Sequence, residues 1–383
     1  MHNILWLASW YPNRVDAFNG DFIERHAIAV SRLANLTVLV IIKDKSLAEK
    51  EVDVEKVVMG NLAVYRVYYG SSPLGGMIEK ILSFKKYLQL QKKWYRQIEK
   101  ERGKPLVVHV HVAMKAGMLA RWLKKRSGLP YLVTEHWTGY YPQSPHNIYE
   151  ANWLFRQLNR RILQDARLVL PVSDALGKII NRQFAQCPCQ VIPNVVDTDL
   201  FYFKPSDPQR FRFIHPSYMN YQKNPEGILE ACKGVRDRGY DFELVMIGNT
   251  DERLVAMTTE LQLTDNVTFQ PAIPYASVAL EMQRSSALLL FSRFENLPCV
   301  LLEALCCGLP VVSSNVGGIE EVINDTNGLL VEIENVSALT ESMISMMENY
   351  ARYNRADIAS RSIAVYNYEA VGRRLVDLYS TLG

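Results

Sequence analysis

Two carboxylates stand eight positions apart in a stretch that connects two apolar runs. The stretch, residues 292–318, reads SRFENLPCVLLEALCCGLPVVSSNVGG. Glu295 follows the apolar run 287–291, and Glu303 lies in a segment of helical spacing that precedes the apolar run 310–312. An apolar run, a loop, a helix and a second apolar run in this order predict a strand–loop–helix–strand unit, which builds a parallel sheet.

Both carboxylates are expected near the start of that helix. Pro298 suits the first helical position, because its missing N–H would be unpaired there in any case. Glu303 would then lie in the second turn, with its side chain directed back toward Glu295 in the loop. The helix start also offers free N–H groups and a positive dipole end, which favour phosphate. Carboxylates that bind hydroxyls beside a phosphate suit a nucleotide-sugar, although an ordinary βαβ unit with two solvated glutamates fits the spacing as well.

The stretch resembles a known signature. The E-x7-E of Glu295 and Glu303, the segment EALCCGLPVVSS and the GG-x-x-E that ends at Glu321 are similar to the donor site of the retaining glycosyltransferases of family 4. These enzymes have the GT-B fold, in which two Rossmann-like, doubly wound parallel-sheet domains form the active site in the inter-domain cleft. The resemblance implies a metal-independent transferase whose donor is a nucleotide-diphospho-sugar.

The resemblance also implies roles for individual residues. Glu303 would bind the ribose hydroxyls, and Glu295 would contact the transferred sugar. The chain departs from the family at residues 296–298, where Asn-Leu-Pro replaces the frequent Gly-Phe-Gly, and Pro298 has no N–H to donate. The residues expected to hold sugar and diphosphate between the two glutamates are Asn296, Leu297, Cys299 and Val300.

Lys223 is the predicted phosphate ligand. It follows the predicted strand 211–215 and matches the family lysine that holds the donor diphosphate. An ammonium group on a flexible stem suits that role. The family commonly has an arginine five residues earlier, where this chain has Tyr218. Arg293 is therefore the candidate for a second cation at the diphosphate.

Other candidates also follow predicted strands. Gly248 and Asn249 come after the strand 242–247, Gly20 ends a turn-rich loop after the first strand, and His136 ends the segment YLVTEH. Ligands of doubly wound folds bind at the carboxyl ends of the strands, which makes all four positions donor-site candidates. A lone histidine is more often structural, but the resemblance implies that His136 lies near the transferred sugar. The candidate catalytic residues are His136, Lys223 and Glu295.

Alternating strands and helices position these residues, and the fold class is α/β. Several predicted strands are continuous apolar runs, as expected when both faces of a parallel sheet are covered. The predicted strands are 3–9, 37–42, 63–68, 106–112, 131–134, 168–172, 211–215, 242–247, 267–270, 287–291, 310–313 and 328–331. The predicted helices of the first half are 21–33, 77–100, 115–126, 149–163 and 175–183.

The chain is long enough for two domains. The segment IPNVVDTDLF resembles the IPNGVD-x-x-x-F that opens the second domain of the family. We therefore expect an acceptor-binding domain over residues 1–190 and a nucleotide-sugar-binding domain over 191–363. The last predicted helix, 364–383, would cross back to the first domain, as it does in GT-B enzymes.

The composition indicates a cytoplasmic enzyme. Of the 383 residues 48% are hydrophobic, yet no apolar run reaches the roughly 18 residues that a membrane span needs. The N-terminus shows no signal peptide, so the cysteines are expected to be buried, reduced thiols. None of them forms a C-x-x-C pair, and we expect no metal site and no cofactor apart from the donor substrate. The cysteines are Cys187, Cys189, Cys232, Cys299, Cys306 and Cys307.

The charge is distributed unevenly. Residues 1–190 carry 28 Lys and Arg against 15 Asp and Glu, whereas residues 191–383 carry 15 against 25. The basic half favours an anionic partner, and no nucleic-acid motif accompanies it. The Lys- and Arg-rich helix 77–104 fits two interpretations: a solvated amphipathic helix that covers the sheet, or a helix that binds anionic lipid at the inner face of the membrane.

The sequence therefore predicts a retaining glycosyltransferase of cell-surface polysaccharide biosynthesis, with a nucleotide-sugar donor and a glycan or polyprenol-linked acceptor. Two alternatives use the same fold. A nucleotide-sugar 2-epimerase would release an epimer without an acceptor, and a non-catalytic nucleotide-sugar-binding subunit is favoured by Tyr218 in place of arginine. The sequence does not identify the base, the sugar, the acceptor, the linkage or the oligomeric state.

Overall fold

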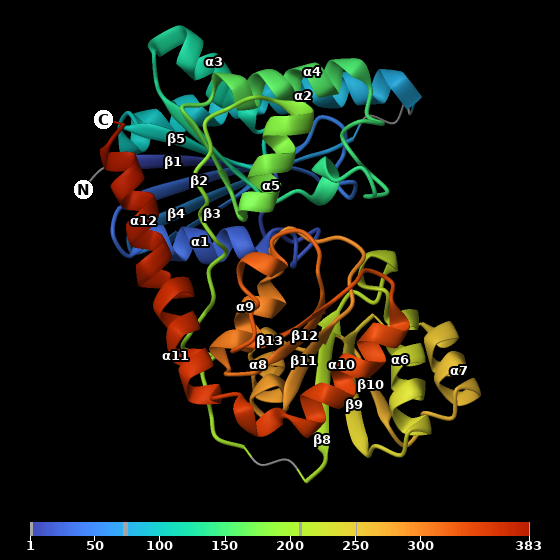
Figure 1. Cartoon of the computed structure of the whole chain (residues 1–383). Coiled ribbons are helices and arrows are strands. Elements are labelled where there is room, and N and C mark those ends of the chain that lie inside the picture. Colours follow the sequence, from blue (N-terminus) through green and yellow to red (C-terminus); the bar gives the residue numbers. More distant parts are fainter. Residues whose placement is uncertain (1–2, 72–75, 207–208, 250, 383) are drawn as a thin grey trace. The chain divides into compact units, whose positions relative to one another are not determined.

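The computed structural model describes residues 3–71, 76–206, 209–249 and 251–382 (Figure 1). Its chain divides into two compact units. The N-terminal unit contains residues 1–142, 146–195 and 368–383, and the C-terminal unit contains residues 143–145 and 196–367. The division after Val195 lies five residues beyond the expected end of the first domain at 190. The final helix belongs to the N-terminal unit.

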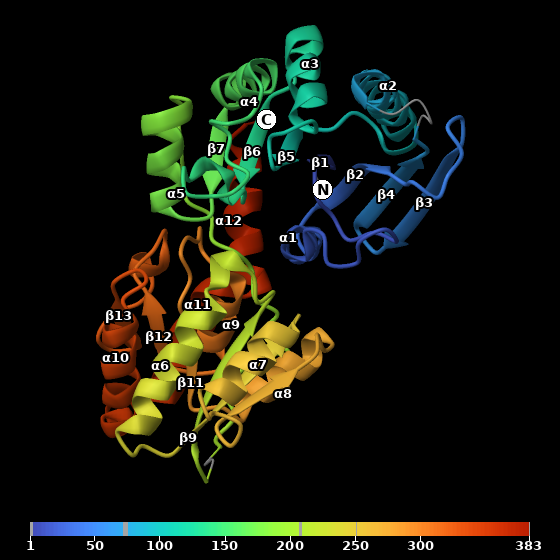
Figure 2. The same cartoon turned by 90° about the vertical axis from the view of Figure 1, so that its right-hand side faces the viewer.

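The N-terminal unit has a seven-stranded sheet in the order β3-β4-β2-β1-β5-β6-β7, with β3 and β4 at one edge (Figure 2). All neighbouring strands are parallel except β3 and β4, which pair antiparallel. The central strands are buried on both faces, which explains their continuous apolar sequence. The strands are β1 (Asn3–Ala8), β2 (Asn35–Lys43), β3 (Val52–Met59), β4 (Leu62–Tyr69), β5 (Val107–His111), β6 (Tyr131–Glu135) and β7 (Leu168–Pro171).

Strand β3 was not among the predicted strands. Its side chains are mostly exposed or half-buried because it forms the edge of the sheet, so it lacks the apolar run that marks the other strands. It joins β4 through a two-residue hairpin at Gly60 and Asn61, with Gly60 at φ 57°. A two-residue hairpin turn requires such a left-handed backbone, which glycine adopts readily.

Helices cover both faces of this sheet. Figure 1 shows α2, α3 and α4 on one face and α1 on the other. The helix α5 continues directly into a π-helical turn at Ile180–Phe184. The helices of the unit are α1 (Asp21–Ser31), α2 (Gly76–Arg102), α3 (Gly117–Ser127), α4 (Trp153–Asp165), α5 (Asp174–Ile179) and α12 (Tyr368–Ser380).

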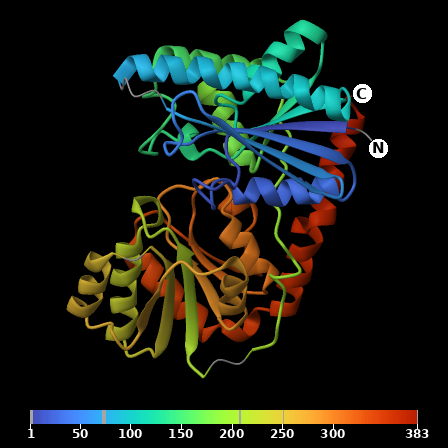
Figure 3. The ribbon, with the colours of Figure 1, turned by 180° about the vertical axis from the view of Figure 1, so that it is seen from behind.

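The last helix, α12, packs along α1 (Figure 3). Gly372 allows the two helices to approach closely, because a Cβ at this position would lie 2.5 Å from the carbonyl oxygen of Ala29. Near the other end of α12, the buried Tyr379 hydroxyl contacts Trp6 Nε1 at 3.2 Å and His109 Nδ1 at 2.6 Å. The end of the chain thus completes the core of the N-terminal unit.

The C-terminal unit has a six-stranded, all-parallel sheet in the order β10-β9-β8-β11-β12-β13. The helices α6 and α10 pack against each other on one face, and α9 packs against α11 on the other (Figure 1). The strands are β8 (Phe211–Ser217), β9 (Phe242–Gly248), β10 (Val267–Gln270), β11 (Ala287–Leu290), β12 (Val311–Ser314) and β13 (Gly328–Val331). The helices are α6 (Pro225–Asp237), α7 (Glu252–Glu260), α8 (Tyr275–Gln283), α9 (Cys299–Cys306), α10 (Val336–Glu348) and α11 (Arg355–Tyr366).

Among the helices of the described ranges, none is both long and apolar enough to cross a membrane.

We predict that Tyr379→Phe destabilises the protein through the N-terminal unit. The substitution leaves Trp6 Nε1 and His109 Nδ1 buried without the hydroxyl that they share, and an unsatisfied buried polar group costs about 1–3 kcal/mol. Urea unfolding followed by circular dichroism measures the loss. The control is Tyr240→Phe, which removes a surface hydroxyl that contacts Glu348 and is expected to cost less than about 0.5 kcal/mol. Equal stability of the two variants would contradict this role of α12.

Candidate functional site

The candidate donor residues of the C-terminal unit follow the carboxyl ends of its parallel strands. Lys223 lies in the 3₁₀ turn Tyr221–Lys223 after β8, Gly248 ends β9, Glu295 follows β11 and Gly317 follows β12. Parallel strands place these ends on one edge of the sheet. The loops after β8 and β11 are in direct contact, because Gln222 and Lys223 both bind Glu295.

Glu295 is the buried acid of this edge. The residue is only 4% exposed. Its carboxylate accepts hydrogen bonds from Ser292 Oγ at 2.8 Å and from Gln222 Nε2 at 3.1 Å. The ammonium group of Lys223 pairs with the same carboxylate. A buried carboxylate is stable only when a cation and hydrogen-bond donors compensate its charge. Lys223 and Glu295 are therefore a single charged unit in the structure.

Two glycines fit the backbone closely at this edge. A Cβ on Gly317, which has φ 59°, would lie 1.8 Å from the carbonyl oxygen of Glu295. A Cβ on Gly248, which has φ 145°, would lie 1.8 Å from the carbonyl oxygen of Ser217. Only glycine fits such contacts, so these positions fix the paths of the loops after β9 and β12. Asn249 directly follows Gly248 and is exposed.

Glu303 lies in the second turn of α9, as predicted. It is 5% exposed, and its Oε1 accepts a hydrogen bond of 2.6 Å from the hydroxyl of Tyr275, the first residue of α8. Pro298 is not the first helical residue but the N-cap, with φ −68° and ψ 131°, and α9 begins at Cys299. Proline has no backbone N–H and therefore needs no hydrogen-bond acceptor at either position, so it fits the N-cap as well as the first helical position.

The residues between the two glutamates form the loop and the first turn of α9. Asn296 and Leu297 are buried in the loop. The carbonyl oxygen of Asn296 accepts a hydrogen bond of 2.7 Å from the N–H of Gly318, which holds this loop against the loop after β12. Cys299 and Val300 are half-buried at the start of α9, where N–H groups lack helical partners.

Arg293 is held beside the turn that carries Lys223. Its Nε donates to Glu334 at 2.7 Å, its Nη1 donates to the carbonyl oxygen of Tyr221 at 2.6 Å, and its guanidinium stacks over the Tyr221 ring at 4.4 Å. Tyr218 is 62% exposed. Arg293 is thus near the predicted phosphate ligand but is occupied by an acidic partner of its own, which the sequence did not indicate.

In the N-terminal unit the half-buried His136 lies in a cluster with three buried histidines, His26, His109 and His111. Its ring lies 5.6 Å from that of His26 and stacks with that of His111 at 6.1 Å, while His109 and His111 are 4.3 Å apart. His109 and His111 lie two positions apart in β5. The sequence gave no sign of His26, which lies on α1, because no short-range spacing connects that helix to β5 and β6.

Burial keeps these imidazoles neutral. Desolvation lowers the pKa of His26 to about 4 and that of His109 to about 3, and it lowers the pKa values of His111 and His136 well below the ordinary value. The adjacent Glu135 shows the opposite effect, because burial raises its pKa to about 7. His136 is therefore a neutral hydrogen-bonding group at physiological pH.

Gly20, one of the donor-site candidates from the sequence, has a left-handed backbone. It is the N-cap of α1 with φ 71°, and a Cβ there would lie 2.8 Å from the carbonyl carbon of Trp10. The loop 10–20 therefore returns closely on itself at this point. Glycine is the residue that permits both the left-handed backbone and the contact.

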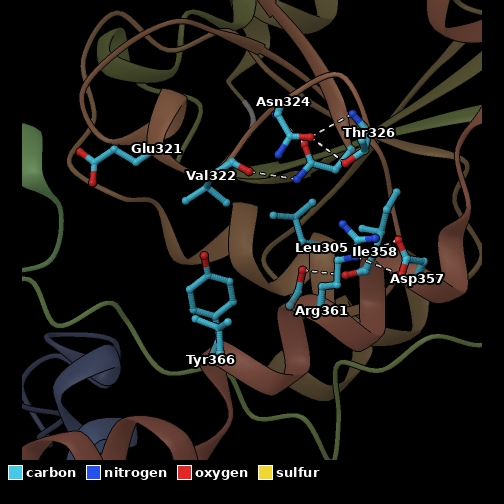
Figure 4. Close-up of a pocket in the computed structure, with 12 residues that line it drawn as sticks. Leu305, Glu321, Val322, Asn324, Thr326, Asp357, Ile358, Arg361 and Tyr366 are labelled. Atoms are coloured by element: carbon cyan, nitrogen blue, oxygen red, sulfur yellow. Dashed lines mark hydrogen bonds and ion pairs between the residues drawn. The ribbon is translucent and has the colours of Figure 1, made fainter.

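Glu321 of the GG-x-x-E segment lines a separate cavity of about 200 Å³. Figure 4 shows it across that cavity from Asp357 and Arg361 of α11. This cavity belongs to the side of the C-terminal unit where α9 meets α11. Within the described ranges no cluster of three or more His, Cys, Asp or Glu side chains is placed to hold a metal ion.

Comparison with protein families identifies the two halves of the chain. A glycosyl transferase 4-like domain matches residues 30–195, and the domain of glycosyl transferases group 1 matches residues 199–362. The chain belongs to the group 1 glycosyltransferases. The family predicted from residues 292–318 is thereby confirmed.

Relatives of this glycosyltransferase are named for several sugar transfers. The chain is 24% identical, over 96% of its length and 93% of the relative's, to a Bacillus subtilis protein provisionally named the teichuronic acid biosynthesis glycosyltransferase TuaC. It is 30% identical to the lipopolysaccharide 1,6-galactosyltransferase of Escherichia coli, over 43% of this chain and 47% of that one.

Solved structures share the complete fold. The sucrose-phosphate synthase of Thermosynechococcus elongatus superimposes with a TM-score of 0.80 at 19% identity, covering 100% of this chain and 99% of the other. The Anabaena protein HepE in complex with UDP superimposes with a TM-score of 0.72 at 15% identity, covering 100% of both chains. The predicted GT-B fold of two parallel-sheet α/β domains is thus confirmed.

We predict that the glycosyltransferase loses stability as the pH falls below about 6.5. The unfolded chain then binds protons on histidines that stay neutral when folded, so each such histidine lowers the free energy of unfolding by roughly 1.4 kcal/mol per pH unit down to its folded pKa. In the C-terminal unit burial also lowers the pKa of His215 to about 4, which adds to the effect. Glu135, with its raised pKa, opposes it between about pH 7 and 4.5.

Urea unfolding at several pH values measures how the free energy of unfolding changes with pH. The informative variant is His111→Phe. Neither ring nitrogen of His111 has a hydrogen-bond partner within the described residues, so phenylalanine removes a titrating group without breaking a hydrogen bond. The variant should retain its stability near pH 7.5 and show a shallower loss in acid. An equal loss of free energy of unfolding per pH unit in the variant and the unmodified protein would contradict this role of His111.

Proposed function

We propose that this glycosyltransferase is a retaining, metal-independent enzyme that transfers a sugar from a nucleotide-diphospho-sugar to a glycan or lipid-linked acceptor in cell-surface polysaccharide biosynthesis. The observation that carries the proposal is the pairing of the half-buried Lys223 with the buried Glu295 at the strand ends. Glu303 on α9 lies eight residues after Glu295. The names of the relatives from Bacillus subtilis and Escherichia coli support a role in the biosynthesis of a cell-surface polysaccharide. The HepE complex with UDP supports a nucleotide-sugar as the donor.

Lys223 is the cation for the donor diphosphate in this proposal. Its ammonium group already compensates one buried carboxylate, so a diphosphate joins an existing charged pair and shares the ammonium with Glu295. The positive dipole end at the start of α9 supplies additional positive potential. Together they stabilise the charge that develops on the leaving diphosphate, and this supply of charge is the reason that we propose no metal requirement.

The two glutamates bind hydroxyls in this proposal. Glu295 is oriented by Ser292, Gln222 and Lys223, so its carboxylate has a fixed direction before a sugar arrives. Glu303 exchanges or shares its hydrogen bond with Tyr275 to bind the ribose hydroxyls. A preoriented carboxylate loses little entropy on binding, which favours discrimination between sugar hydroxyl patterns.

We predict that Lys223→Ala lowers the rate of sugar transfer about a hundredfold to a thousandfold, as expected when one preorganised electrostatic group is removed. The assay uses a panel of nucleotide-sugars with a lipid-linked glycan acceptor, and nuclear magnetic resonance of the product reads the anomeric configuration. A retained configuration and activity in the presence of a chelator are the expected results.

The matched control for this assay is Lys233→Ala, which removes an exposed lysine paired with Asp237 on α6. It should transfer sugar at the original rate. Full activity of Lys223→Ala would contradict the diphosphate role. Release of an epimerised nucleotide-sugar without acceptor would favour an epimerase, and donor binding without any turnover would favour a non-catalytic subunit.

We further propose that the N-terminal unit binds an anionic membrane surface from the cytoplasmic side through the first turns of α2. Met77 and Ile78 are 72% and 60% exposed, and Ile81 is 49% exposed. The later part of the helix instead packs on the protein through buried residues such as Tyr87 and Tyr95. The two interpretations of this helix therefore apply to different parts of it: the apolar residues near its start are not part of the core.

We predict that the protein binds vesicles containing anionic lipid and is released by salt, because surface charge attraction is screened within about 8 Å at physiological ionic strength. The double variant Ile78→Ser, Ile81→Ser should bind more weakly by tenfold or more, since burying an isoleucine side chain contributes roughly 1.5–3 kcal/mol. The control is Val255→Ser, Leu280→Ser, which removes exposed apolar residues from α7 and α8. Equal binding to neutral and anionic vesicles would contradict the proposal.

A further inference from the structure

Two cysteines of the N-terminal unit lie together at its surface. Cys187 and Cys189 flank Pro188, and their sulfur atoms are 3.8 Å apart. Cys189 is exposed and Cys187 is half-buried, whereas Cys232, Cys306 and Cys307 are buried. The expectation that the cysteines are buried is therefore wrong for this pair and for the half-buried Cys299. Residues two positions apart on an extended chain direct their side chains to the same side, which brings the two sulfur atoms together.

The surrounding structure holds both thiols in position. Asn181, in the π-helical turn after α5, donates from Nδ2 to Cys189 Sγ at 3.0 Å and accepts from the backbone N–H of Cys187 at 2.9 Å. The chain at Cys189 also forms a β-bridge with Val169 of β7, whose N–H donates to the carbonyl oxygen of Pro188 at 2.8 Å. Neither sulfur is therefore at the end of a free loop.

The two thiols differ in acidity. The contact with Cys187 lowers the pKa of the Cys189 thiol, burial opposes this change, and the hydrogen bond from Asn181 lowers the pKa again. The same sulfur–sulfur contact raises the pKa of the Cys187 thiol. Cys189 is also the exposed sulfur of the pair, whereas Cys187 is half-buried. Because the thiolate is the nucleophilic form of cysteine, exposure and acidity both make Cys189 the nucleophile of the pair.

A cavity of about 190 Å³ gives small molecules access to Cys189. Its lining includes the cationic residues Lys178 and Arg182, the acid Asp174, and Asn181. Such a space beside an exposed sulfur accommodates a small disulfide compound with charged groups. The three buried cysteines offer no comparable access.

We propose that Cys187 and Cys189 form a thiol–disulfide exchange site that reacts with low-molecular-weight disulfides and closes to a bridge between the two residues. The Cys189 thiolate attacks one sulfur of the disulfide, forms a mixed disulfide and releases one thiolate, which takes a proton from water. Cys187 then loses its proton to solvent and attacks Cys189 Sγ, which releases the second thiol. The protein dithiol is oxidised, and one disulfide is reduced to two thiols.

Closure requires the two sulfur atoms to approach from 3.8 Å to about 2.05 Å. A bridge between residues only two positions apart is constrained, and constrained, exposed disulfides are reduced easily. The site is therefore reversible. This inference is independent of the proposed sugar transfer, because the pair lies among residues that have no role in donor binding.

The experiment treats the full-length protein with glutathione disulfide, alkylates the remaining thiols and analyses the intact mass and the peptide that contains both cysteines. We expect that peptide to lose the mass of two hydrogen atoms and to regain it with a reducing agent. In Cys187→Ser the reaction should stop at a stable glutathione adduct on Cys189. In Cys189→Ser the reaction should be slower by tenfold or more.

The control is Cys232→Ser, which removes a buried thiol and should oxidise like the unmodified protein. A stable glutathione adduct on the unmodified protein would overturn the closing step. Preferential reaction of another cysteine, or equal rates for Cys189→Ser and the unmodified protein, would overturn the assignment of Cys189 as the nucleophile. The result on the unmodified protein stands even if a variant fails to fold, which circular dichroism reveals.

Discussion

The C-terminal unit depends on the compensation of one buried negative charge. Glu295 lies at the carboxyl end of β11, away from solvent, and a carboxylate in that position requires a cation and hydrogen-bond donors. Lys223, Gln222 and Ser292 supply them from two different loops. The buried charge thus holds the loop after β8 against the loop after β11. The loop after β12 also packs here, because Gly317 lies close to the carbonyl oxygen of Glu295. One buried carboxylate and the backbone next to it thus connect three strand-end loops of the C-terminal unit.

The N-terminal unit also contains titratable side chains away from solvent, but it keeps them in the neutral form. Three buried histidines and the half-buried His136 lie together in it, and desolvation keeps all four neutral. The hydroxyl of Tyr379 on α12 satisfies two of the surrounding polar atoms, so the last helix contributes polar contacts as well as apolar packing. Neutral imidazoles stabilise the fold only while the pH stays above their ordinary pKa, which makes acid sensitivity a consequence of how this core is built.

Two features set this chain apart from the family pattern that its sequence resembles. Tyr218 stands where an arginine is common, and the nearby Arg293 is engaged by Glu334 and Tyr221. Pro298 caps α9 and removes one N–H from the loop that precedes it. In the function that we propose, both features reduce the hydrogen-bond donors available to a diphosphate, so Lys223 takes a larger share of that role.

The sequence by itself determined the family, the α/β fold class and nearly all the strands, because a strand buried on both faces must be a continuous apolar run and the E-x7-E pattern is specific. It also placed Lys223, Gly248 and Glu295 directly after predicted strands, because the order of elements along the chain decides which residues follow a strand. It missed β3, since an exposed edge strand has no such run.

Only the tertiary structure decided which of these residues touch. The pairing of Lys223 with Glu295, the engagement of Arg293 by Glu334 and the entry of His26 into the cluster around His136 join residues far apart in the chain. The exposure of Cys189 likewise follows from its place at the rim of β7, which no local pattern encodes. Local sequence specifies the hydrophobic periodicity of each helix or strand and the residues at which it ends. Which residues are buried and which touch depends on how these elements pack, and packing is a property of the whole chain.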